Sequence, residues 1–166
     1  MKTHYLNISD EEHFEFDVFS IDCNESIYRV INDINDQLSI SLEFTELLDL
    51  SHKEGEDFLF PVYCFKHQEL NIEINLIPNE TSLQPSYHHT PKTASFDLFA
   101  GDIELTVKLL PELSTTNYLL LIKGENRYLY NHTILQALKE ITLFEVVKEI
   151  FIEDLADKSS RNHLLF

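Results

Sequence analysis

The chain has 166 residues, with 12 Lys or Arg against 29 Asp or Glu, so its formal net charge at pH 7 is −17. A chain of this length can bury enough surface for a self-sufficient core, and we expect a single domain over residues 1–166. The acidic balance argues against direct binding to a nucleic-acid phosphate backbone. We favour solubility as the role of this charge, because the acidic residues are spread along the chain, and attraction of a partner protein with a basic surface is the alternative.

The apolar segments are too short for a signal peptide or a membrane span. The longest aliphatic run is Leu119 to Ile122, far short of what either requires. Two cysteines, Cys23 and Cys64, are too few for a disulfide framework. We therefore predict a cytoplasmic protein with reduced, packed thiols and no membrane contact. Its Asn-x-Ser/Thr sequences are interpreted as chance matches at Asn7, Asn24, Asn79 and Asn131.

The N-terminal part predicts strands. The sequence of residues 2–8 predicts a short first strand. In residues 14–23 the alternation of apolar side chains slips by one position between Val18 and Phe19. This slip indicates either a β-bulge or a strand whose two faces are covered by different layers.

An amphipathic helix and a hairpin come next. Apolar residues at helical spacing, preceded by Asn24 as a cap, predict a helix over residues 25–38. Residues 41–44 predict an edge segment. The aromatic-rich residues 58–65 and the alternating residues 70–76 predict the two strands of a hairpin.

Residues 79–95 contain scattered Pro, Ser and Thr without periodicity, and we expect a long loop there. Alternation over residues 103–109 then predicts a strand that ends at Pro111, because proline has no N–H to donate. Residues 118–122 form an apolar run without alternation, typical of a strand covered on both faces. We expect these two strands to pair as a hairpin.

The C-terminal part predicts a second helix over residues 131–141, capped by Asn131. Residues 144–152 suit either a helix or a strand, and we favour a strand because of their β-branched side chains. The tail, residues 157–166, is expected to dock on the domain through its apolar end, Leu164, Leu165 and Phe166. The predicted fold is thus α+β, a mostly antiparallel sheet of about six to eight strands with the helices 25–38 and 131–141 on one face.

The turn between the predicted strands resembles the signature of the bacterial IPExxxVDY family. Pro111, Glu112 and Tyr118 match that signature at its spacing. The Ile, Val and Asp of the signature are replaced by Leu110, Thr116 and Asn117. The resemblance implies a small single-domain cytosolic protein. It implies no activity, because the family has none assigned.

Two interpretations of this turn remain. Glu112 is a candidate base and Tyr118 a candidate hydrogen-bond donor if both face one pocket, although the amide of Asn117 cannot transfer a proton as the family's carboxylate could. In the other interpretation, which we favour, Pro111, Glu112, Asn117 and Tyr118 are structural. Glu112 and Asn117 then accept hydrogen bonds from the turn, and Tyr118 packs with its hydroxyl at the rim.

The other polar residues give weaker signals. His88, His89, Asp97 and Asp102 are candidate metal ligands, but adjacent histidines on an extended chain point in opposite directions, so we favour an exposed loop without metal. Cys23 precedes a helix whose dipole would lower a thiol pKa, yet Asp22 and Glu25 oppose this and favour a packed thiol. Nucleophile motifs and phosphate-binding glycine loops are absent, so we predict no cofactor.

The leading functional hypothesis is a non-enzymatic cytosolic interaction or regulatory protein with a basic partner. The alternative is a metal-dependent or hydrolase-like enzyme that uses residues 79–102 and Glu112. A third interpretation is a homodimer formed through an exposed sheet edge such as Leu42 to Phe44.

Overall fold

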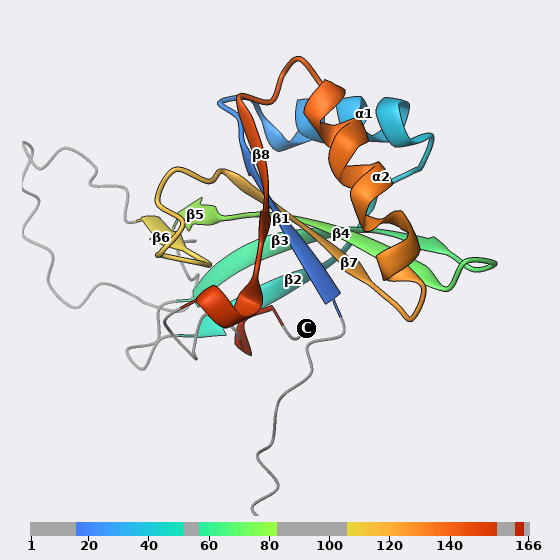
Figure 1. Ribbon diagram of the computed structural model, residues 1–166. Coiled ribbons are helices and arrows are strands. Elements are labelled where there is room, and N and C mark those ends of the chain that lie inside the picture. Colours follow the sequence, from blue (N-terminus) through green and yellow to red (C-terminus); the bar gives the residue numbers. More distant parts are fainter. Residues whose placement is uncertain (1–15, 52–56, 83–105, 156–161, 165–166) are drawn as a thin grey trace, which may run out of the picture.

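The computed structural model describes residues 16–51, 57–82, 106–155 and 162–164 (Figure 1). The strands are β1 (Phe16–Asp22), β2 (Glu43–Ser51), β3 (Asp57–His67), β4 (Ile72–Pro78), β5 (Glu80–Ser82), β6 (Thr106–Lys108), β7 (Tyr118–Lys123) and β8 (Val146–Ile150). The helices are α1 (Ile27–Leu38), α2 (Arg127–Glu140) and the short 3-10 helix η1 (Ile152–Asp154).

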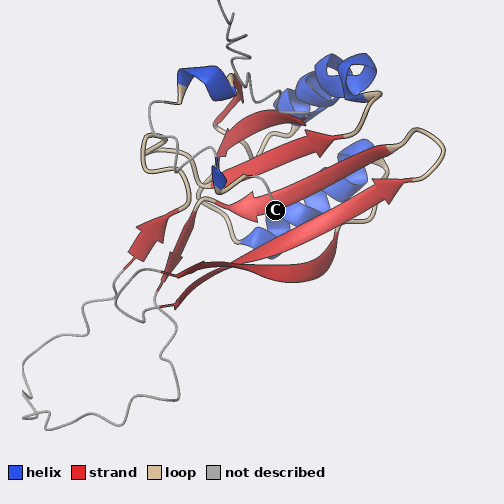
Figure 2. Ribbon diagram, turned by 90° about the horizontal axis from the view of Figure 1, so that it is seen from below, coloured by secondary structure: helices blue, strands red, loops and turns tan. Residues whose placement is uncertain are grey.

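Six of these strands form one antiparallel sheet in the order β2-β3-β4-β7-β1-β8. The short strands β5 and β6 pair separately as a two-stranded ribbon. Figure 2 shows α1 and α2 on the same side of the large sheet. The predicted α+β class, with a mostly antiparallel sheet and two helices, is therefore confirmed.

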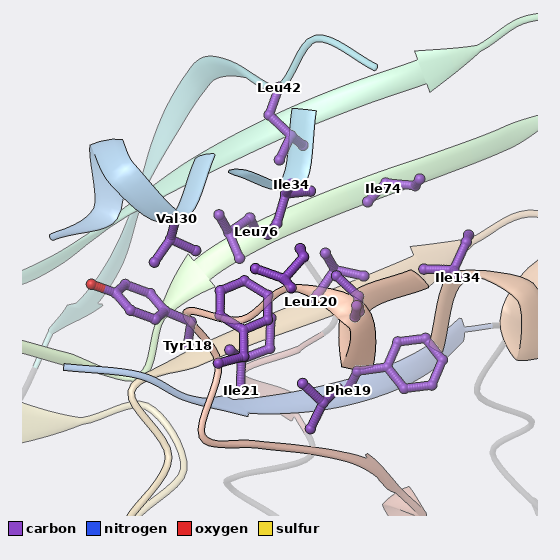
Figure 3. Close-up of a cluster of buried hydrophobic side chains, with 14 of the residues drawn as sticks. Phe19, Ile21, Val30, Ile34, Leu42, Ile74, Leu76, Tyr118, Leu120 and Ile134 are labelled. Carbon is purple, nitrogen blue, oxygen red and sulfur yellow. The ribbon is translucent and has the colours of Figure 1, made fainter. Parts of the chain in front are cut away.

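The large sheet has a hydrophobic core on each face. On the helix face, side chains of α1 and α2 pack on β1, β4, β7 and β8 (Figure 3). On the opposite face, the 109–113 segment, η1 and Leu164 cover β1, β3, β4 and β7. Leu164 is fully buried there, whereas Leu165 and Phe166 lie outside the described residues.

The slip in β1 reflects this two-sided burial. Phe16 and Val18 belong to the opposite-face core, and Phe19 and Ile21 belong to the helix-face core. The pairing of β1 with β7 runs unbroken from Phe16 to Ile21, so β1 has no bulge. Of the two interpretations of the sequence, a strand covered on both faces is therefore the correct one.

Both helices begin away from their predicted caps. The residue that precedes α1 is Ser26, and the Asn24 side chain donates to Glu145 instead. α2 begins at Arg127, so Asn131 lies inside the helix rather than at its start. The sequence pattern did not predict that α2 begins this early, because the exposed residues Tyr128 and Leu129 break the amphipathic spacing.

Two of the predicted strand regions are confirmed. The predicted hairpin is formed by β3 and β4, which pair from Tyr63 with Leu76 to His67 with Ile72. The ambiguous residues 144–152 contain β8, which pairs with β1. Of the two alternatives, helix and strand, the strand is therefore correct, and its Val147 side chain packs in the helix-face core.

The predicted hairpin between residues 103–109 and 118–122 is wrong. β7 lies between β4 and β1, and β6 pairs with β5. The apolar run of β7 is fully buried from Leu119 to Ile122, so it needs a hydrogen-bonded strand on each side and a core on each face. Part of the predicted loop 79–95 is also ordered as β5, and its remainder lies outside the described residues.

Gly124 gives a direct test of the connection between β7 and α2. Its φ is +113°, and a Cβ there would lie 2.1 Å from the backbone oxygen of Asn71. We expect Gly124→Ala to lower the free energy of unfolding by at least about 2 kcal/mol. The alanine would be strained at this positive φ, and its Cβ would clash with the Asn71 backbone, which cannot move aside as a flexible side chain could. Urea unfolding measures the loss. Glu125→Ala, at the exposed neighbouring position, is the control, and equal stability of the two variants would contradict this account.

Candidate functional site

The turn that resembles the family signature is built around the buried side chain of Asn79. This residue follows β4 and is 0% exposed. Its Oδ1 accepts the Leu110 N–H at 2.8 Å. Its Nδ2 donates to the carbonyl oxygens of Leu113 and Thr116, both at 3.1 Å. One side chain therefore satisfies groups along the whole turn.

The backbone of Asn79 completes this arrangement. Its N–H donates to the Asn117 carbonyl at 2.8 Å, and its own carbonyl accepts the Leu109 N–H at 2.8 Å. Leu109 and Leu110 are held inward and are fully buried in the opposite-face core. Residues 111 and 112 consequently lie on the exposed outer side of the turn.

Asn117 and Tyr118 connect the turn to β1 and α1. The Asn117 side chain accepts the Cys23 N–H at 2.8 Å, and its backbone N–H donates to the Ile21 carbonyl at 3.1 Å. The Tyr118 hydroxyl donates to the Glu25 carbonyl at the start of α1. In Figure 3, Tyr118 lies at one end of the helix-face core, beside α1. Asn117 thus accepts from β1, and not from the turn as the sequence suggested.

The two candidate residues Glu112 and Tyr118 differ in burial. Tyr118 is 8% exposed, and burial raises the pKa of its hydroxyl. Glu112 lies on the exposed side of the turn. The hydrogen bonds of Asn117 and Tyr118 join the turn to the end of β1 and to the residues before α1.

The candidate metal ligands cannot be placed, because His88, His89, Asp97 and Asp102 lie outside the described residues. Over the positions that the structure covers, no three His, Cys, Asp or Glu side chains converge as a metal site would require. The thiol of Cys23 is packed in the helix-face core, and burial raises its pKa although a hydrogen bond with the Glu25 backbone opposes the shift. This is the behaviour of an unreactive thiol.

A surface that the sequence did not reveal lies on the edge strand β2. Phe44 and Leu47 are 56% and 50% exposed. Phe44 is paired with Tyr63, and their rings meet edge-on with centroids 6.0 Å apart. A register shift between Phe44 and Glu46 keeps Phe44 and Leu47 on the same face although they are three positions apart.

Tyr28 of α1 extends this surface. It is 70% exposed, and burial together with the neighbouring Tyr28 hydroxyl raises the pKa of Tyr63. We call Tyr28, Phe44, Leu47 and Tyr63 the apolar strip. Among the described residues the helices leave this strip exposed, because β2 contributes no side chain to the helix-face core and the β3 side chains that pack on this core are only partly buried.

Two hollows lie near the β3–β4 hairpin, at the end of the sheet away from the Pro111–Tyr118 turn. One, of about 280 Å³, surrounds the β3–β4 hairpin and is lined by Lys66, Glu73 and Lys123 among others. Lys66 and Glu73 form an ion pair at 2.8 Å, and burial lowers the pKa of Lys123. The second hollow lies between the helices and the hairpin, and it shares His67 and Ile72 with the first.

Comparison with known proteins adds no functional assignment. No protein-family model, curated protein or solved structure matches the chain. Among the described helices, none is long and apolar enough to span a membrane.

Asn79 is the residue on which the turn can be tested. We expect Asn79→Ala to lower the free energy of unfolding by about 3 kcal/mol, because it leaves the buried N–H of Leu110 and the carbonyls of Leu113 and Thr116 without partners. Chemical denaturation measures the change. Asn32→Ala, at an exposed position of α1, is the matched control and should stay within about 0.5 kcal/mol of the wild type. A loss below about 1 kcal/mol for Asn79→Ala would show that water replaces its hydrogen bonds.

Proposed function

We propose that this chain is a non-enzymatic interaction protein of the cytoplasm, whose edge strand β2 binds an extended basic segment of a partner protein. The observation that carries the proposal is the apolar strip beside the edge strand β2. An open edge invites further strand pairing, and proteins usually limit it with short strands, charges, bulges or covering elements. β2 has a register shift and exposed carboxylates, yet it is long and keeps apolar side chains in water. β2 has nine residues and exposes Phe44 and Leu47.

The geometry suits strand addition. β2 ends the strand order of the large sheet, so its outer backbone groups have no strand partner within the described part of the chain. An added strand would satisfy these groups, and its alternate side chains would lie on the apolar strip beside Phe44 and Leu47. Backbone pairing then supplies affinity, and the strip supplies the preference for apolar residues at every second position.

The negative charges on and around β2 favour a partner segment with basic side chains. Glu43, Glu46 and Asp49 are exposed on β2, and the whole chain carries a net charge of −17. A segment whose apolar residues lie on the apolar strip would turn its alternate Lys or Arg residues toward Glu43 and Glu46 on the other face of β2. The long-range field would raise its association rate.

The same charges disfavour a second copy. Two β2 strands paired antiparallel would bring the carboxylates of both copies together, and like charges directly opposite are destabilising. In addition, Leu42 of the predicted dimer edge is 5% exposed and belongs to the helix-face core. The partner is therefore more consistent with a basic segment than with another copy of the chain.

The enzyme alternative gains no support from the described residues. All polar atoms of Asn79 are engaged with the turn, and Glu112 and Tyr118 lie in different surroundings. The interaction proposal rests on β2 and the apolar strip, and it needs none of these groups.

The test uses a defined peptide of alternating Lys and Val, nine residues long like β2, and an otherwise identical peptide with Glu in place of Lys. We expect the basic peptide to bind at low salt, to weaken as salt rises, and to protect β2 amides from hydrogen exchange. Phe44→Ser should reduce the affinity at least about tenfold, which corresponds to about 1.4 kcal/mol. Fluorescence anisotropy measures the affinity.

Phe151→Ser is the matched control, because Phe151 is 59% exposed and follows β8 at the other edge of the sheet. It should leave the affinity within about twofold of the wild type. Equal loss in both variants, or equal binding of the acidic peptide, would contradict the proposal. A dimer in sedimentation that Phe44→Ser dissociates would assign the edge to a second copy instead.

A further inference from the structure

The hollow between the helices and the hairpin is an apolar cavity at the open end of the helix-face core. It lies between the C-terminal end of α1, the first half of α2 and the β3–β4 hairpin, and its volume is about 190 Å³. Its wall combines aliphatic side chains such as Leu70 and Ile134 with the rings of Phe65 and Tyr130. We call it the α1–α2 cavity.

The core closes at one end of the helices and stays open at the other. Val30 and Ile34 of α1 and Leu138 of α2 are 0% exposed. Around the cavity, by contrast, Leu38, Ile40, Phe65, Leu70 and Tyr130 pack against the core while remaining only partly buried. An apolar molecule in the cavity would remove this remaining surface from water, which is the main favourable term in apolar binding.

Size and polarity define the ligand. A cavity of about 150 Å³ lined by aliphatic and aromatic side chains accepts one benzene ring, so about 190 Å³ holds one substituted ring or two fused rings. In a chain with 29 acidic and 12 basic residues, no Asp, Glu, Lys or Arg is found among the described residues that line it. A charged ligand would lose its hydration there without gaining a counter-charge.

His67 supplies a polar group of defined orientation. Its Nδ1 accepts the Leu70 N–H at 3.4 Å, so in the neutral ring the proton is on Nε2. The ring also meets Phe65 edge-on, with centroids 6.2 Å apart and an interplanar angle of 86°. His67 is one of the residues that line the cavity, and it also borders the neighbouring hollow. Its ring therefore brings a potential hydrogen-bond donor to an otherwise mostly apolar wall.

We propose that the α1–α2 cavity binds a small uncharged aromatic molecule whose oxygen accepts a hydrogen bond from Nε2 of His67. This site is distinct from the apolar strip on β2, and its occupancy does not require the partner segment. The ligand class follows the general form of small-molecule sites, in which an apolar wall supplies burial and a few polar groups set orientation.

The probes are p-cresol, toluene and benzoate, titrated into the full chain and followed by ¹H–¹⁵N NMR. We expect p-cresol to bind saturably, with shifts at Leu70, Tyr130 and Ile134. Toluene, which has no acceptor, should bind more weakly, and benzoate should bind most weakly because of its charge. Thr133→Phe should reduce p-cresol affinity at least about tenfold by filling the cavity.

Gln136→Phe is the control, because Gln136 is exposed on the same helix and does not line the cavity. It should leave p-cresol binding unchanged. His67→Phe keeps a ring but removes the donor, and it should abolish the preference for p-cresol over toluene. Absence of saturation, equal effects of the Thr133 and Gln136 variants, or shifts confined to β2 would overturn the proposal.

Discussion

The buried carboxamide of Asn79 is the interaction on which the central part of the structure depends. It binds the turn of residues 109–117 from inside, while its backbone pairs with Asn117 and Leu109. Its position at the end of β4 links that strand to the entry into β7. Because buried amide groups are costly to leave unpaired, the contact also brings Leu109 and Leu110 inward as part of the opposite-face core.

The central position of β7 has a consequence for both proposed surfaces. With β7 between β4 and β1, the helices cover the middle of the sheet, and their core takes its buried strand residues from β1, β4, β7 and β8. β2 and part of β3 remain outside that cover. The apolar strip begins at Tyr28 near the start of α1, and the α1–α2 cavity lies at the other end of the same helix. Incomplete cover of one sheet face therefore produces both surfaces.

Local patterns predicted some elements well and failed where pairing between distant segments decides the structure. The spacing of Val30, Ile31 and Ile34 identified α1, because those side chains face one core. The alternation in residues 103–109 suggested a hairpin with residues 118–122, yet β7 pairs with β4 and β1. Nothing local distinguishes a neighbouring strand from a distant one, since each offers the same backbone groups. Asn79 was missed likewise, because the hydrogen-bond partners of its side chain are 31 to 37 positions away.

The sequence by itself determined the α+β class, the burial of residues 118–122 and the strongly acidic surface, because periodicity, apolar runs and charge are local properties of the chain. It also favoured a structural interpretation of the Pro111–Tyr118 turn, but it gave no sign of the contacts that hold this turn. Only the tertiary structure decided that Asn79 organises this turn, that β2 is an exposed edge with an apolar strip, and that His67 lines a cavity. Each of these depends on which distant segments become neighbours, and that is settled by the packing of the whole chain.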